Sequence, residues 1–104
     1  FLVNKISGLR IFSDENDKMN LSIKDVNGSA LVISQFTLCG NTKKGRRPSF
    51  VNAALPDDGN RLYEYFISEM QKGGVPIESG EFGAMMDVEL VNDGPVTFVL
   101  NSKD

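Results

Sequence analysis

The chain contains no histidine and no tryptophan, and it has a single cysteine among 104 residues. Without histidine there is no imidazole to act as a general base, so a Ser-His-Asp triad and a Cys-His dyad are both excluded. The lone thiol, Cys39, excludes an internal disulfide and a multi-thiolate metal cluster, and we expect no metal and no cofactor. A hydrolase built on this chain therefore needs another proton acceptor.

Long hydrophobic runs are also lacking, since no apolar stretch approaches the roughly 20 residues that cross a bilayer. We therefore expect no membrane partner. For a mass of 11.4 kDa, the surface of a compact monomer is expected to be roughly 5,800 Å², which corresponds to one domain over residues 1–104. The near absence of cysteine favours a reducing compartment, and we expect a cytoplasmic location.

Apolar spacing predicts two helices. One covers residues 2–9. The other begins with Asp57 or Asp58 as its cap and ends before Gly73 and Gly74. The apolar positions of the long helix are expected to pack on a sheet, and they are Leu62, Phe66 and Met70, with Tyr63 and Ile67 beside them.

Five short runs are typical of strands. Residues 9–12 and 19–23 flank a polar turn, and residues 30–33 form a continuous apolar run that predicts a strand buried on both faces. Residues 85–91 and 96–100 flank the turn at residues 92–95 and predict a C-terminal hairpin. The order of elements predicts an α+β fold with a mixed, largely antiparallel sheet and one long packed helix.

Residues 43–47 carry four cations and no anion in a chain whose net charge is −3. Lys44, Arg46 and Arg47 supply positive charge, and the two arginines also supply planar donor forks that suit phosphate. The loop therefore indicates an interaction with nucleic-acid phosphates. A solvated surface loop explains the same residues equally simply.

Three further stretches contain residues that could form a binding site. Residues 34–38 place two hydroxyls and an amide at the exit of a buried strand, although alternating hydroxyls also suit a solvent-facing strand. Residues 82–86 combine an aromatic ring with two thioethers, which suit either a base pocket or core filling. Gly94-Pro95 permits a close backbone approach to a ligand, or forms a plain hairpin turn.

Together these residues resemble the D-aminoacyl-tRNA deacylases, also called D-tyrosyl-tRNA deacylases. The resemblance rests on four separated motifs in the family's order, which are Ser34-Gln35-Phe36-Thr37-Leu38, residues 44–50, Phe82-Gly83-Ala84-Met85-Met86 and residues 92–98. It implies hydrolysis of the ester between a D-amino acid, or mischarged glycine, and tRNA. It also implies a barrel-like core and a homodimer whose active sites lie at the subunit interface.

Residue roles follow from the same resemblance. Ser34, Gln35, Phe36 and Thr37 would form the catalytic site, with backbone N–H groups near Phe36 holding the oxyanion. Thr37 as nucleophile and a water activated by the tRNA ribose hydroxyl both remain open, and the lack of histidine favours the water. Substrate binding would fall to Gly94 and a cis Pro95, which exclude L-amino acids, to Phe82 and Met86 against the terminal adenosine, and to Lys44, Arg46 and Arg47 against phosphates.

Two alternatives accompany this hypothesis. One is a noncatalytic nucleic-acid-binding protein of the same fold. The other is the related animal-type deacylase, which has a trans proline and a different strand-exit motif, so residues 34–36 argue against it. Because the family has a hairpin before its first helix, the resemblance also implies that residues 1–104 form a deacylase domain that lacks its N-terminal segment.

Overall fold

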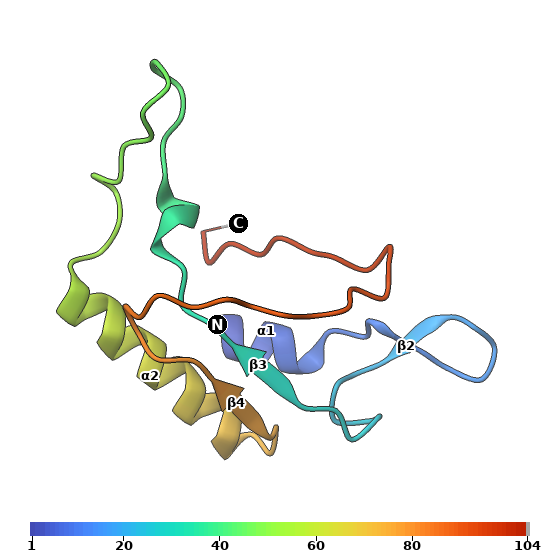
Figure 1. Ribbon diagram of the computed structural model, residues 1–104. Helices are drawn as coiled ribbons and strands as arrows, with labels where there is room; N and C mark the ends of the chain where they lie inside the picture. Colours follow the sequence, from blue (N-terminus) through green and yellow to red (C-terminus); the bar gives the residue numbers. More distant parts are fainter. Residues whose placement is uncertain (104) are drawn as a thin grey trace.

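A computed structural model describes residues 1–103 and contains two α-helices, one short 3-10 helix and four short strands. The helix α1 covers Leu2–Gly8 and is followed by strands β1, Phe12–Ser13, and β2, Met19–Leu21. Strand β3, Ala30–Val32, leads into the 3-10 helix η1, Phe36–Cys39. Helix α2, Pro56–Lys72, and strand β4, Ile77–Ser79, complete the set (Figure 1).

The strands form two separate two-stranded sheets. β1 and β2 pair antiparallel, as the first pair of runs predicts, whereas β3 pairs in parallel with β4 after the chain has crossed through α2. Strand β4 was not predicted, because three residues are too few to show a period. The mixed α and β character is confirmed. Among residues 1–103 the strands do not close into a barrel, and antiparallel pairing does not predominate.

The turn between β1 and β2 is held by one carboxylate. Asp14 accepts hydrogen bonds from the Asn20 side chain at 2.9 Å and from the backbone N–H groups of Asn16 and Lys18 at 2.8 and 3.0 Å. The bond from Asn20 contributes most to lowering the pKa of Asp14, and the two backbone bonds lower it further. In the turn that follows β2, Asn27 adopts a positive φ of 55°.

Helix α2 carries most of the core. Its buried residues are Tyr63, Ile67 and Met70, and Leu62 is 53% exposed, so the inward stripe is rotated by one position from the predicted one. Neither predicted cap is correct. Leu55 is the N-cap, without a side-chain bond, and both aspartates lie in the first turn, where they favour the positive end of the helix. Gly73 ends the helix as predicted, and Gly74 adopts a φ of 91°.

Two other predictions about strands are wrong. Strand β3 is not buried on both faces, because Leu31 is 57% exposed. Residues 85–91 and 96–100 form an open excursion with a turn at Gly94 and Pro95 and no strand pairing (Figure 1). No described element packs along this excursion in the way a sheet would, and an isolated two-stranded hairpin is only marginally stable. No described helix has the length and apolar character needed to span a membrane.

Candidate active site

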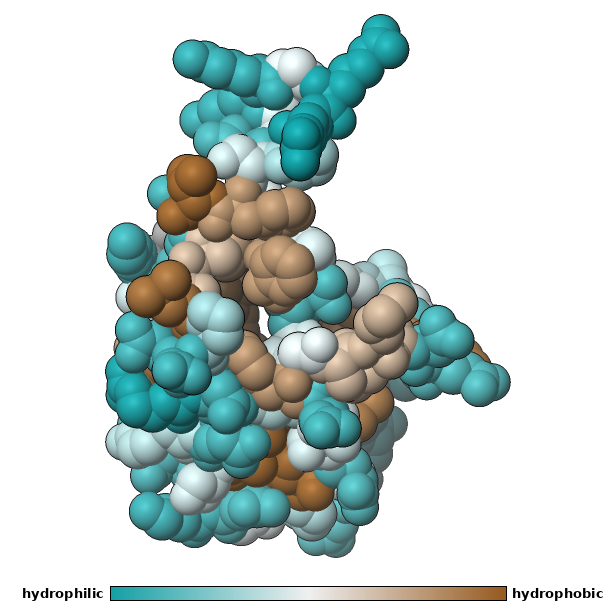
Figure 2. Space-filling model, turned by 60° about the vertical axis from the view of Figure 1, so that its left-hand side comes forward, coloured by the Kyte–Doolittle hydropathy of each residue, from teal (hydrophilic) through white to brown (hydrophobic). Residues whose placement is uncertain are grey.

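A cleft of about 690 Å³ lies beside the first turns of α2. Three segments that are far apart in the sequence meet there: the exit of β3 with η1, the start of α2, and the chain after β4. The cleft brings together five of the predicted site residues, which are Ser34, Gln35, Phe36, Phe82 and Met86. Figure 2 shows apolar side chains gathered around a hollow below a hydrophilic projection. The arrangement can bind a flat, partly apolar group against polar side chains.

The 3-10 helix η1 forms one wall. Its first backbone N–H groups, those of Phe36 and Thr37, have no acceptor within the turn, as at the start of any helix. The Phe36 ring packs against Phe50 in an edge-on arrangement with 5.1 Å between the ring centroids. Gly40 follows η1, and a side chain there would come within 3.0 Å of the Phe50 ring. A Cβ there would also lie 2.9 Å from the backbone carbonyl oxygen of Thr37, so the tight end of the turn favours a glycine.

Thr37 lies in η1 but does not line the cleft. Its hydroxyl accepts a hydrogen bond from the Gln35 side-chain amide. An amide is no base, and among the described residues no carboxylate is hydrogen-bonded to this hydroxyl. The geometry thus couples Gln35 to Thr37 without providing a group that would take the Thr37 proton.

The opposite wall comes from α2 and residues 82–86. The Tyr63 and Phe82 rings lie 5.9 Å apart at a tilt of 41°. Gly59, one turn earlier on the helix, leaves room for the Phe82 ring, since a Cβ there would be 3.1 Å from Phe82 Cζ. Met86 is 37% exposed and lines the same cleft. These contacts place one aromatic ring and one thioether at the edge of the hollow.

The basic loop lies apart from the cleft. Residues 41 and 49 form an isolated antiparallel bridge, so the segment between them projects from the body of the molecule (Figure 1). Lys44, Arg46 and Arg47 are exposed, and the ion pairs found within residues 1–103 do not involve them. Their charge is therefore available to a ligand at the tip of the loop.

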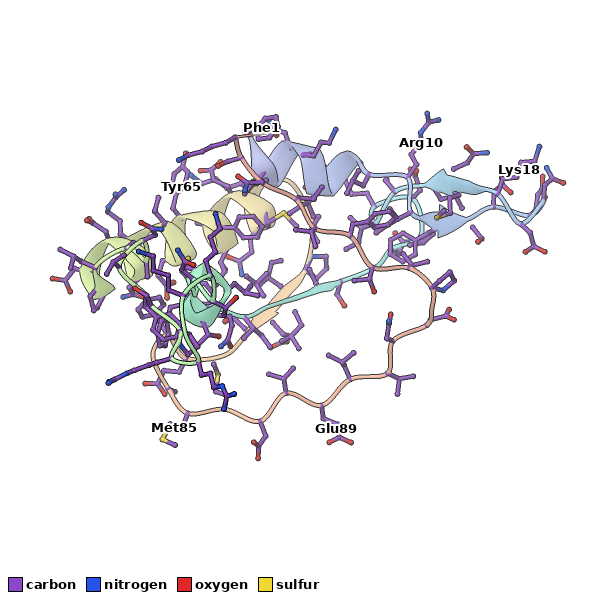
Figure 3. All side chains as sticks on the ribbon, turned by 90° about the horizontal axis from the view of Figure 1, so that it is seen from above. Phe1, Arg10, Lys18, Tyr65, Met85 and Glu89 are labelled. Carbon is purple, nitrogen blue, oxygen red and sulfur yellow. The ribbon has the colours of Figure 1, made fainter. Side chains whose placement is uncertain are left out.

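Gly94 and Pro95 do not reach the cleft of their own chain. They lie at the far turn of the open excursion, both exposed, and Asn92 donates a hydrogen bond to Thr97 across the turn at 3.3 Å. The Gly94–Pro95 peptide bond is cis, as the resemblance implies. Figure 3 shows the side chains of Met85 and Glu89 pointing outward from the first limb of this excursion.

Several lining residues were not predicted, above all Tyr63, Gly59 and Cys39. The signal for Tyr63 was present, because it belongs to the apolar stripe of α2, but periodicity does not tell a core residue from a cleft residue. Gly59 was not singled out either, and the signal that could have found it is its position as a glycine inside a predicted helix. In the part of the chain that the structure describes, no three acidic or thiol side chains converge as metal ligands.

Comparison with known proteins adds to this geometry. The profile of the family described as D-Tyr-tRNA(Tyr) deacylase matches residues 1–101. Proteins named D-aminoacyl-tRNA deacylase from Bacillus cytotoxicus and Koribacter versatilis are 60% and 58% identical over 103 residues, which is 99% of this chain and 70% and 69% of theirs. A solved structure named c-Myc DNA Unwinding Element Binding Protein is 39% identical, with a TM-score of 0.82 over 91% of this chain and 65% of its own.

Proposed function

Because the chain belongs to the D-Tyr-tRNA(Tyr) deacylase family, it is an aminoacyl-tRNA ester hydrolase that acts on D-aminoacyl-tRNA, and we propose that the cleft beside α2 holds the aminoacyl end of this substrate. The observation that carries the proposal is the convergence of residues from three separate segments. The exit of β3 contributes Ser34, Gln35 and Phe36, and helix α2 contributes Gly59 and Tyr63. The chain after β4 contributes Phe82 and Met86.

In this proposal the ester carbonyl lies at the start of η1. The backbone N–H of Phe36, a residue that lines the cleft, has no acceptor within the turn, so it is available to the oxyanion that develops when the carbonyl is attacked. Ser34 and Gln35 line the cleft beside Phe36 and shape it around the ester. Stabilising the oxyanion with backbone N–H groups needs no ionisable side chain.

The attacking group is a water molecule that the ribose hydroxyl of the tRNA activates. Thr37 is the weaker candidate, because Gln35 already bonds its hydroxyl and no base accompanies it among the described residues. The water oxygen forms the new bond to the carbonyl carbon, the ester bond to the ribose breaks, and a proton passes to the departing ribose oxygen. The products are free tRNA and the D-amino acid.

The tRNA itself would be held at two places. Phe82 and Met86 contact the terminal adenosine, since a ring and a thioether at the cleft edge suit a base. Lys44, Arg46 and Arg47 contact phosphates through the projecting loop, whose charge no described acidic side chain neutralises. Because aminoacyl-tRNA is made and used in the cytoplasm, the proposal includes a cytoplasmic location. It also treats residues 1–104 as one deacylase domain.

Gly94 and Pro95 are proposed as the filter that rejects L-amino acids. Since they lie far from the cleft of their own chain, they would enter the cleft of a second subunit, which supports a homodimer with active sites at the interface. Backbone atoms would occupy the space that an L side chain needs, whereas D-amino acids and glycine would fit.

The test is deacylation of tRNA charged with D-Tyr, L-Tyr or glycine. We expect rapid loss of D-Tyr and glycine and retention of L-Tyr. Equal loss of the two tyrosyl esters would overturn the filter, and no loss of any ester would overturn the enzyme.

A second candidate function is noncatalytic binding of nucleic acid. It is favoured by the name of the solved relative, a DNA unwinding element binding protein, and by the exposed basic loop. Tight binding of uncharged nucleic acid without loss of any ester would support this alternative over the deacylase.

A further inference from the structure

Tyr63 is tied to both strands that lead into the cleft. It lies on the buried face of α2 and is only 9% exposed. Its hydroxyl lies 2.9 Å from the carbonyl oxygen of Val32 and 3.3 Å from that of Gly80. A tyrosine has one hydroxyl proton to donate, so the shorter bond to Val32 is the stronger and the contact to Gly80 shares the same proton.

These two carbonyl groups mark where the strands end. Val32 is the last residue of β3, and the four residues that follow it, Ile33 to Phe36, all line the cleft. Gly80 follows the last residue of β4, and Phe82 comes two residues later. Because β3 and β4 are parallel, both exits leave the same edge of the sheet. One hydroxyl therefore contacts both segments that carry the proposed catalytic and base-binding residues.

The same helix face also positions the Phe82 ring. The Tyr63 ring lies 5.9 Å from it, and Gly59 leaves room for it, since a Cβ there would be 3.1 Å from Phe82 Cζ. Neither Tyr63 nor Gly59 supplies a charge or a nucleophile. Their contribution is to hold other groups at fixed positions, which matters because displacements of about 1 Å in an active site are costly to rate.

We propose that Tyr63, assisted by Gly59 one turn earlier, is the positioning residue of this active site. It holds the end of β3, the end of β4 and the Phe82 ring in register, so that the ester and the adenosine of one substrate meet their separate binding groups. The inference rests on the proposed function, because it takes the cleft beside α2 to be the site of deacylation.

The experiment compares Tyr63→Phe with Tyr65→Phe in the deacylation of D-Tyr-tRNA. Both changes remove one hydroxyl from α2, but Tyr65 is 62% exposed and no hydrogen bond joins its hydroxyl to any described residue (Figure 3). We expect Tyr63→Phe to lower kcat about tenfold, with a smaller change in KM because the basic loop is remote from the substitution. Tyr65→Phe should retain the rate of the unmodified chain. A Tyr63→Phe protein with a lower unfolding temperature but an unchanged kcat would overturn the inference.

A second variant covers the case in which Tyr63→Phe does not fold. Gly59→Ala keeps every hydrogen bond and favours the helix, since alanine has the higher helix propensity. It nevertheless pushes on the Phe82 ring. We expect kcat to fall while the unfolding temperature stays equal or rises, and an unchanged kcat would overturn the inference. Inactivity of the unmodified chain would overturn the proposed function and this inference together, whereas a failure confined to the variants leaves the proposed function intact.

Discussion

At the scale of single residues, the cleft and the proposed filter differ in how many contacts their residues make within one chain. Tyr63 is buried and bonded, so its role is visible within one chain. Gly94 is exposed, and a Cβ added there would meet no atom within 4 Å. Nothing within the described chain therefore requires a glycine at that position. If the filter is correct, the requirement comes from a substrate bound to a second subunit.

This contrast predicts the effect of Gly94→Ala. The unfolding temperature should not change, because the methyl group points into open space. Deacylation of D-Tyr-tRNA should fall at least about tenfold, a loss of roughly 1.4 kcal/mol of transition-state stabilisation, because the methyl narrows the space beside the substrate. Thermal unfolding and single-turnover deacylation measure the two effects.

Gly8→Ala is the matched control, since a Cβ at Gly8 also meets no atom within 4 Å. It should leave the rate unchanged. A Gly94→Ala protein with the full rate would show that the turn does not face the substrate.

At the scale of elements, the projecting loop is proposed to bind tRNA phosphates, and helix α2 is proposed to hold the cleft in shape. The loop at residues 43–47 is exposed throughout and carries charge to a distance from the body, whereas α2 holds the cleft by packing. Contacts to phosphate act through charge and are screened by salt, but packing is not. Binding of tRNA and catalysis should therefore respond differently to ionic strength.

Lys44→Ala and Arg46→Ala test the loop. Each should weaken tRNA binding more at low salt than at high salt, and each should reduce the slope of log K against log salt by about one. Measurements of tRNA affinity over a salt series determine both quantities. The control is Lys18→Ala, which removes one exposed cation from the β1–β2 turn (Figure 3). Equal effects from all three variants would show that the loop contributes only to overall charge.

At the scale of the whole molecule, one chain buries less surface than its mass predicts. Its accessible surface is 8845 Å², against roughly 5,800 Å² for a compact monomer of this size. Its radius of gyration is 15.7 Å, against about 13 Å for 100 residues. Large apolar side chains are strongly exposed near the cleft and the loop, among them Leu38, Val51 and Leu55 at 86, 84 and 74%. Such a surface favours burial against further protein surface, of which the proposed second subunit is one source.

The proposed homodimer gives a direct prediction. Sedimentation should return twice the chain mass of 11.4 kDa, and added salt should not dissociate the assembly because the exposed patches are apolar. The tRNA complex measured in parallel should weaken with salt, which provides the internal control. A mass of one chain at every concentration that supports deacylation would contradict the interface site.

The sequence alone determined the features that depend on near neighbours. Helical spacing located α1 and α2 to within a few residues, and the polar turn between residues 12 and 19 and the basic loop at residues 43–47 follow from local backbone preferences. The four motifs were sufficient to identify the family, which the profile match confirms. The residue roles that they imply stay predictions, to be decided by the substitutions described above.

Only the tertiary structure decided which segments meet. The parallel pairing of β3 with β4, the rotated inward face of α2 and the two bonds of Tyr63 all join residues that are far apart in the chain. Residues 85–100 show that a local pattern is not sufficient. Their alternating pattern predicts strands, but no strand of the described residues pairs with them. Periodicity reports the environment that a residue prefers, whereas the cleft depends on contacts that exist only once the chain has folded.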